Sequence, residues 1–98
     1  GFDCSGLMYY LYQTEAGITL GGSSRSQAYN GWAVSWYDLK PGDLLFFNTS
    51  GSGISHVGLY VGNGQMIHAS DYIYGVCIDN IYSGNWSRNF VTARRILN

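Results

Sequence analysis

One predicted β-hairpin constrains the fold of this chain more than any other feature. Residues 56–61 and 65–70 are rich in strand-forming side chains, and they flank Gly62-Asn63-Gly64. Two such runs around a short glycine- and asparagine-containing segment are typical of antiparallel strands joined by a tight turn. The middle of the chain is therefore expected to form a sheet.

The register of this hairpin decides where its two histidines lie. We expect Gly62-Asn63-Gly64 to form a three-residue loop. The resulting pairs are Val61 with Gln65, Tyr60 with Met66, Gly58 with His68, and His56 with Ser70. His56 and His68 then lie on one face, on a diagonal whose Cβ atoms are about 7 to 8 Å apart. A two-residue turn at Asn63-Gly64 would place the two histidines on opposite faces.

A helix is predicted from Asp3 to Gly17. Its apolar residues recur at spacings of three and four, which places them on one face: Leu7, Met8, Leu11 and Tyr12. Asp3 suits the N-cap, and Gly17 suits the C-terminal stop. Cys4 therefore falls on the first turn of the helix.

The remaining segments complete an α+β layout. A short apolar strand is predicted over residues 44–47, after a Pro-Gly turn, and two more strands over 72–78 and 90–96. Residues 80–89 read as an irregular loop. Residues 21–26 read as a loop that leads into a poorly defined segment with room for a short helix. One helix followed by an antiparallel sheet is an α+β arrangement.

Length and charge exclude several classes of protein. Ninety-eight residues support one domain, which we assign to residues 1–98. Five Lys and Arg against six Asp and Glu give a net charge of −1, so we expect no nucleic-acid partner. The chain has no apolar run of the roughly 20 residues that cross a bilayer. Cys4 and Cys77 are too few for a disulfide framework and lack the CxxC spacing of a zinc site.

Cys4, His56 and His68 form a candidate catalytic set. A thiol on the first turn of a helix feels the positive end of the helix dipole, which favours the thiolate. A histidine in hydrogen-bond reach can take the thiol proton, and a second polar group behind it fixes the ring. We assign Cys4 as nucleophile, His56 as base and then acid, and His68 as the residue that orients His56. The free backbone N–H of Cys4 is a natural oxyanion donor.

Each of these residues also has a plainer interpretation. Free cysteines are usually buried as small hydrophobic residues, and Cys77 is interpreted in this way. A single histidine in a strand is more often structural than catalytic. A zinc site formed by Cys4, His56 and His68 stays open on residue type, although no short-spaced ligand pair exists. A disulfide between Cys4 and Cys77 is a further alternative.

Four sequence blocks together resemble the NlpC-type cell-wall cysteine peptidases. They are Phe2-Asp3-Cys4-Ser5-Gly6-Leu7, Leu39-Lys40-Pro41-Gly42-Asp43-Leu44, Ser55-His56-Val57-Gly58-Leu59-Tyr60-Val61-Gly62-Asn63-Gly64 and Ile67-His68-Ala69. The blocks occur in the family's order and at its usual separations, over nearly the whole chain. Arg25-Ser26-Gln27 matches a family segment more loosely.

The resemblance implies a circularly permuted papain-like α+β fold and a cofactor-free reaction. The family cleaves peptidoglycan stem peptides, commonly between D-γ-glutamate and a diamino acid. By position, Cys4 matches its nucleophile, His56 its base and His68 its orienting residue. In the same family, residues that line the substrate groove correspond to Asp3, Ser5 and Ser55.

The resemblance also implies a longer parent protein. Family members carry a further helix and a Tyr- or Trp-containing stretch before the cysteine block, and residues 1–98 lack both. The tyrosine of that stretch helps build the oxyanion site in the family. Loss of one oxyanion donor lowers rates by about 10²- to 10³-fold, so residues 1–98 alone are expected to be weakly active or inactive. We expect additional domains and a secreted or wall-associated bacterial location. The alternatives are a peptidoglycan amidase and a catalytically impaired module that binds cell-wall peptides.

Overall fold

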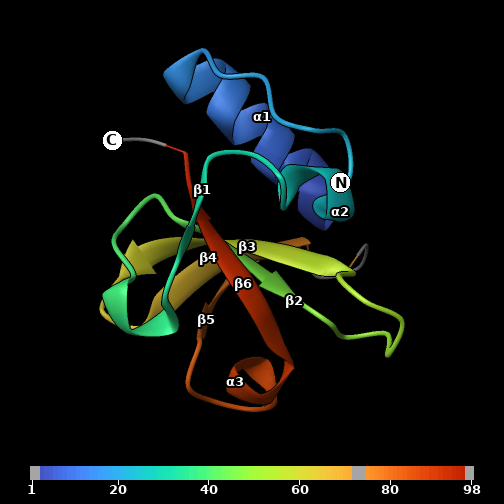
Figure 1. The fold of residues 1–98 in the computed structure, drawn as a ribbon, viewed down its shortest axis with the longest axis vertical. Coiled ribbons are helices and arrows are strands. Elements are labelled where there is room, and N and C mark those ends of the chain that lie inside the picture. Colours follow the sequence, from blue (N-terminus) through green and yellow to red (C-terminus); the bar gives the residue numbers. More distant parts are fainter. Residues whose placement is uncertain (1–2, 72–74, 97–98) are drawn as a thin grey trace.

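The computed structural model describes residues 3–71 and 75–96 and has an α+β architecture, as the sequence predicted. Helix α1 (Cys4–Ala16) lies on one face of an antiparallel sheet (Figure 1). The strands are β1 (Trp32–Val34), β2 (Leu44–Phe47), β3 (His56–Gly62), β4 (Gln65–Asp71), β5 (Gly75–Asn80) and β6 (Phe90–Arg95). In the described part of the chain their order across the sheet is β1-β6-β2-β3-β4-β5.

Helix α1 has the predicted caps at both ends. The Asp3 carboxylate accepts a hydrogen bond from the backbone N–H of Gly6 at 2.6 Å. Gly17 adopts the left-handed conformation, with φ of 68°, and its N–H donates to the carbonyl of Gln13. Because the N-cap fixes where the helix begins, Cys4 becomes its first residue.

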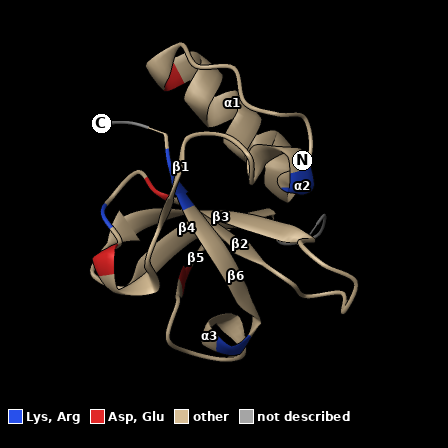
Figure 2. Cartoon of the chain, viewed as in Figure 1, with Lys and Arg blue, Asp and Glu red and all other residues tan. Residues whose placement is uncertain are grey.

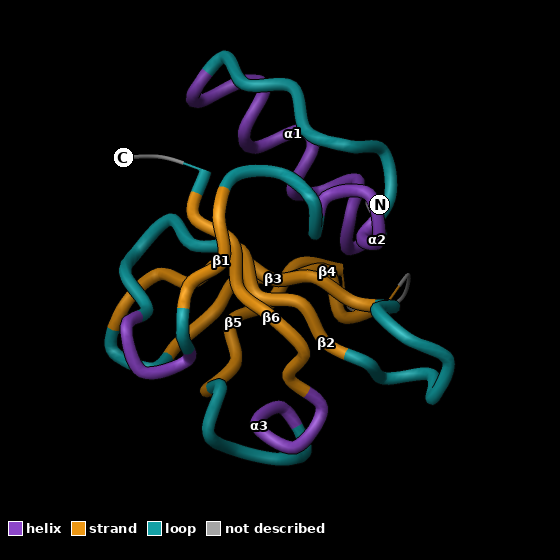
Figure 3. The backbone as a smooth tube through the Cα atoms, in the orientation of Figure 1, coloured by secondary structure: helices purple, strands orange, loops and turns teal. Residues whose placement is uncertain are grey.

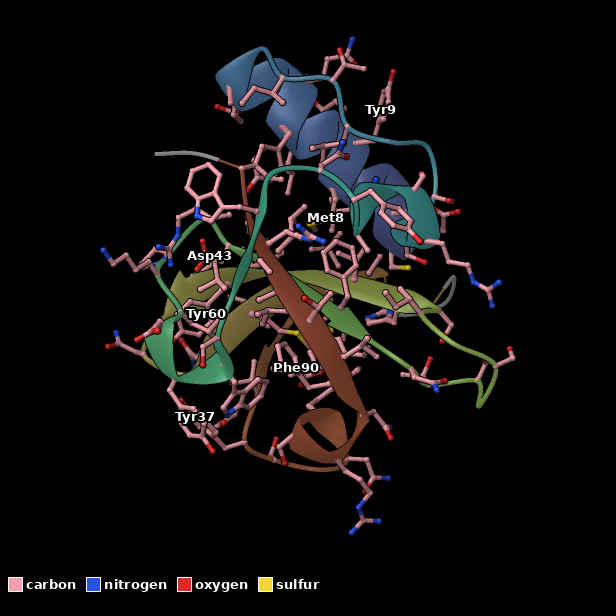
Figure 4. All side chains as sticks on the ribbon, in the orientation of Figure 1. Met8, Tyr9, Tyr37, Asp43, Tyr60 and Phe90 are labelled. Atoms are coloured by element: carbon pink, nitrogen blue, oxygen red, sulfur yellow. The ribbon has the colours of Figure 1, made fainter. Side chains whose placement is uncertain are left out.

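Strand β2 is buried on both faces and divides the core into two layers. All four of its residues are buried. The layer under α1 contains, from β2 and α1, Leu44, Phe46, Leu7, Met8 and Tyr12. The layer on the other face contains Leu45, Phe47, Tyr60, Met66, Ile81 and Ala93. Figure 4 shows Met8 between α1 and the sheet, and Phe90 on the opposite side of the sheet.

The hairpin between β3 and β4 has a two-residue turn, so the predicted three-residue loop is wrong. Asn63 and Gly64 both have positive φ, 54° and 73°, as a type I′ turn requires. Gly62 therefore pairs with Gln65, in the place that the prediction gave to Val61.

A bulge in β3 nevertheless restores the expected register. The pairing shifts between Tyr60 and Gly62, so that one extra residue lies unpaired on β3. Beyond the bulge Tyr60 pairs with Met66, as predicted. His56 and His68 consequently lie on the same face, where their side chains meet at hydrogen-bond distance.

Five short elements differ from the sequence prediction or were not specified by it. Within the predicted loop 21–26, helix α2 (Ser24–Gln27) begins at a reciprocal Ser23–Ser26 capping box. Within the predicted loop 80–89, α3 (Trp86–Asn89) forms a single helical turn. The strand predicted at 72–78 is observed as β5 and ends at Asn80, while residues 72–74 lie outside the described residues. Strand β1 and the 3₁₀ turn at Trp36–Asp38 occupy the poorly defined segment.

A buried ion pair ties the last strand to the turn before β2. Asp43 is 1% exposed, and its two carboxylate oxygens accept from Nε and Nη2 of Arg95, each at 2.8 Å. The backbone N–H of Lys40 donates to the same carboxylate. These hydrogen bonds raise the pKa of Arg95. Removal of Arg95 would leave the buried Asp43 carboxylate without its charged partner.

Charged side chains are sparse elsewhere, and Figure 2 shows them scattered over separate elements. Within the described residues, no helix has the length and apolar character needed to cross a membrane.

Tyr12 connects α1 to the turn before β2, and its ionisation provides a test of this contact. Its hydroxyl donates to the carbonyl of Gly42, and burial, followed by the nearby Asp43 carboxylate, raises the pKa of Tyr12 to about 12. Between pH 10 and 12 the unfolded chain therefore binds fewer protons than the folded chain, and the free energy of unfolding falls as pH rises. We expect urea denaturation at increasing alkaline pH to show a steeper loss for wild type than for Tyr12→Phe. Equal slopes would contradict this assignment.

Candidate active site

Cys4 lies where the start of α1 meets the start of β3. The half-buried thiol donates to the carbonyl oxygen of Ser55 at a distance of 3.9 Å. Ser55 directly precedes His56, which is the first residue of β3. The start of α1 and the start of β3 therefore meet at one end of the sheet (Figure 1).

A chain of hydrogen bonds runs behind His56 across three neighbouring strands. Nε2 of His56 lies 2.9 Å from Nδ1 of His68. Nε2 of His68 lies 2.7 Å from Oδ2 of Asp79. The side chain of His68 is 1% exposed and that of Asp79 is 45% exposed, so the chain leads from the buried histidine toward solvent.

This order of partners assigns the protons on both rings. An ionised carboxylate only accepts, so Nε2 of His68 carries the proton that is donated to Asp79. Nδ1 of neutral His68 is then an acceptor, and Nε2 of His56 must be the donor. Nδ1 of neutral His56 is left without a proton. It is therefore the ring nitrogen that can act as a base.

The surroundings of His56 keep this ring uncharged. Its pKa is lowered to about 4, first by burial and then by the neighbouring His68. The imidazole stacks on Trp86, with ring centroids 5.4 Å apart and an angle of 25° between the planes. At neutral pH the resting His56 is neutral, so it becomes an imidazolium only when it takes a proton from a donor such as the Cys4 thiol.

The three residues predicted to line a substrate groove surround Cys4 but also have structural bonds. The Asp3 carboxylate caps α1, and Ser5 is 8% exposed. The hydroxyl of Ser55 accepts from the backbone N–H groups of Thr49 and Ser50. It thereby closes the loop between β2 and β3, which Figure 3 shows projecting from the end of the sheet. The carbonyl of Ser55, rather than its hydroxyl, contacts the thiol.

Helix α2 connects the two halves of this site, a role that sequence reasoning missed. The buried Gln27 donates from Nε2 to the carbonyls of Ser5, at 2.9 Å, and Gly21, at 2.8 Å. Arg25 donates from Nε to the carbonyl of Ile54 at 3.1 Å. One short helix therefore holds both the turn that carries Cys4 and the loop that leads into His56. The loose motif match at Arg25-Ser26-Gln27 was the signal available in the sequence.

Asp79 and Cys77 were also missed as neighbours of His68. Cys77 pairs directly with His68 across β4 and β5, and its Sγ lies 3.5 Å from His68 Nε2. Cys4 and Cys77 are both free, so the alternative disulfide is not formed. In the described part of the chain, metal-ligating side chains gather at His68, Cys77 and Asp79, and not at the alternative set of Cys4, His56 and His68.

A cysteine at the start of a helix, packed on an antiparallel sheet that carries paired histidines, defines a papain-like α+β protein. The model of the NlpC/P60 family matches residues 1–95. The chain belongs to the NlpC/P60 family.

Curated relatives cover nearly all of this chain, which spans only a part of each of them. The "Probable endopeptidase p60" of Listeria grayi is 46% identical over 95 residues, which is 97% of this chain and 18% of that protein. The "Murein DD-endopeptidase MepH" of Escherichia coli K12 is 37% identical over 100 residues, covering 99% of this chain and 37% of that protein.

Solved structures confirm the fold. An NlpC/P60 family protein from Bacillus cereus has a TM-score of 0.92 and 38% identity, covering 100% of this chain and 32% of that one. The peptidoglycan hydrolase RipB of Mycobacterium tuberculosis has a TM-score of 0.82 and 33% identity, covering 100% of this chain and 46% of that one.

Gln27 should be necessary for the stability of the site. Replacement by Leu removes the hydrogen bonds from Nε2 to the carbonyls of Ser5 and Gly21, and such a bond typically contributes about 0.5 to 1.5 kcal/mol. We expect Gln27→Leu to lower the free energy of unfolding by at least that amount in urea denaturation. Gln13→Leu, at an exposed glutamine of α1, is the matched control and should change little. Equal stability of the two variants would refute the bracing role of α2.

Proposed function

We propose that this chain is a cysteine endopeptidase domain that hydrolyses the stem peptides of bacterial peptidoglycan. The observation that carries the proposal is the hydrogen-bonded order Asp79, His68, His56, which leaves an unprotonated His56 Nδ1 at the end of the sheet where Cys4 lies. The names of the E. coli and M. tuberculosis relatives, a murein endopeptidase and a peptidoglycan hydrolase, support this class of substrate.

The proposed reaction begins with proton transfer from the Cys4 thiol to Nδ1 of His56. The thiolate then attacks the peptide carbonyl carbon, and the resulting oxyanion accepts from the free backbone N–H of Cys4. Collapse breaks the C–N bond while the His56 imidazolium gives its proton to the leaving amine, which leaves a thioester on Cys4. Water, deprotonated by His56, hydrolyses the thioester and restores the thiol.

His68 and Asp79 act through His56 as positioning residues in this proposal. His68 holds the ring of His56 and presents an acceptor to Nε2, so Nδ1 stays available to Cys4. Asp79 fixes the tautomer of His68 by accepting from its Nε2. Asp79 resembles the acid of a catalytic triad, which sets the tautomer of the histidine without being protonated itself.

We assign the scissile bond to the link between D-γ-glutamate and a diamino acid, with no cofactor. Asp3, Ser5 and Ser55 are proposed to line the groove, supported by their position around Cys4. Because the matched relatives are far longer than this chain, we further propose that it works beside additional domains in a secreted or wall-associated bacterial protein.

The proposal is tested by mass spectrometry of purified stem peptides after incubation with the chain. We expect a new product that ends in γ-glutamate with wild type and none with Cys4→Ala, because only Cys4 is the nucleophile. Cys77→Ala is the matched control: it removes the other thiol and should retain cleavage.

Other products would overturn particular parts of the proposal. Release of the whole stem peptide from the sugar would indicate the amidase alternative. Cleavage of the D,D cross-link would change the assigned bond. Peptide binding without any cleavage would indicate the binding module, and cleavage by Cys4→Ala would exclude the nucleophile.

Asp79 should affect turnover rather than substrate affinity. Asp79→Asn removes the negative charge that fixes the proton on His68, so we expect kcat to fall on the order of 10- to 100-fold, by analogy with other orienting partners of histidine. KM and the urea midpoint should stay near the wild-type values. The control is Glu15→Gln, which removes an exposed carboxylate on α1 instead of the one on β5. An unchanged kcat for Asp79→Asn would remove Asp79 from the mechanism.

A further inference from the structure

We propose that His68, Cys77 and Asp79 form a binding site for a divalent transition metal ion of the zinc type, and that occupation of this site inhibits hydrolysis. The ligand atoms are His68 Nε2, Cys77 Sγ and an Asp79 carboxylate oxygen, which all lie within 4.8 Å of one another. The inhibitory part of the inference rests on the proposed function, whereas binding of the ion does not.

The three ligand atoms suit a borderline-soft ion. Imidazole nitrogen, thiolate sulfur and carboxylate oxygen are the donors that zinc takes in proteins, usually in tetrahedral geometry. Calcium and magnesium prefer sets made of oxygen alone. With three protein ligands, one tetrahedral position remains for water or another small ligand. The chemistry of the set therefore selects zinc and its neighbours in the transition series.

Two of the three distances between these atoms can be compared directly with those around a bound ion, and the third is at most 4.8 Å. Tetrahedral zinc, with bonds of about 2.1 Å to N or O and about 2.3 Å to S, holds such ligands about 3.3 to 3.6 Å apart. His68 Nε2 and Cys77 Sγ are already separated by 3.5 Å. His68 Nε2 and Asp79 Oδ2, now hydrogen-bonded at 2.7 Å, need to separate by about 0.6 Å for the same geometry.

The backbone holds the ligands on one rigid frame. His68 and Cys77 are directly paired across β4 and β5. Asp79 follows Cys77 by two residues on β5, so both side chains point to the same face of the sheet. Ala69 is likewise paired with Val76, and Asp79 is paired with Met66. Little backbone ordering is therefore needed when an ion binds.

The site has a buried inner wall and an open outer side. His68 is 1% exposed, and its other nitrogen is held by His56 at 2.9 Å. A hydrogen bond at the second ring nitrogen is the usual way in which a metal-ligating histidine is oriented. The Asp79 side chain is 45% exposed, so an ion can enter from solvent.

Binding of the ion breaks the link between His68 and Asp79. The ion takes the lone pair of His68 Nε2 and the Cys77 thiolate, whose proton leaves to solvent. His68 then carries its proton on Nδ1 and donates it to Nε2 of His56, so the proton of His56 moves to its own Nδ1. The Asp79 carboxylate then coordinates the ion and no longer accepts from His68. Since the proposed mechanism depends on that hydrogen bond, turnover falls while the substrate groove stays open.

Binding is tested with Co²⁺ as a spectroscopic substitute for zinc, in the Cys4→Ala chain so that Cys77 is the single thiol. We expect a thiolate-to-cobalt charge-transfer band and the visible bands of tetrahedral cobalt. Both should disappear in Cys4→Ala/Cys77→Ala, with unchanged circular dichroism. Absence of the bands in Cys4→Ala would overturn the site whether or not the chain is an active peptidase.

Inhibition is tested by titrating Zn²⁺ against stem-peptide hydrolysis by wild type and Cys77→Ala. Cys77 has no part in the proposed reaction, so both should hydrolyse at the same rate without metal. We expect at least tenfold more Zn²⁺ to be needed for half-inhibition of Cys77→Ala. Equal sensitivity would place the inhibitory ion elsewhere, such as on Cys4, and would overturn the inhibitory role.

Discussion

Burial of β2 on both faces is the constraint on which the rest of the structure depends. A strand with four consecutive apolar residues has no side to offer to solvent, so it needs a layer of structure above and below. On one face the layer is α1, which brings Cys4. On the other face it is the aromatic cluster around Trp86, which packs against His56 and His68. Cys4 and His56, the proposed nucleophile and base, thus come from opposite layers and lie at the same end of the sheet.

The chemistry of the site depends on the order of donors and acceptors as much as on distance. Two neutral histidines in contact have two possible proton arrangements, and only one of them leaves Nδ1 of His56 without a proton. Asp79 selects that arrangement because a carboxylate has no proton to give. Burial of His56 acts in the same direction, since it lowers the pKa and keeps the ring neutral before reaction. The hydrogen bonds from Asp79 through His68 and the burial of His56 therefore both favour a neutral His56 ring.

Features of the fold that depend on local residue types could be predicted from the sequence, whereas those that depend on tertiary contacts could not. Both caps of α1 and the strand at β2 followed from residue type. The pairing of Tyr60 with Met66 was predicted correctly, and so was the shared face of His56 and His68. The turn was predicted wrongly, because a bulge at Val61 has no signature of its own in the sequence. Asp79 could not be recognised as a partner of His68. Its place depends on how β5 pairs with β4, and a single sequence does not fix that pairing.

Helix α2 has a consequence for the dynamics of the molecule. A helix of four residues is too short to be stable alone, so the hydrogen bonds of Gln27 and Arg25 to distant carbonyls are what keep it ordered. The same bonds join the loop that leads into His56, the proposed base, to the helix that carries Cys4, the proposed nucleophile. Ordering of this short segment and assembly of the catalytic geometry are therefore one equilibrium. A local opening too small to unfold the sheet would be enough to separate the reacting groups.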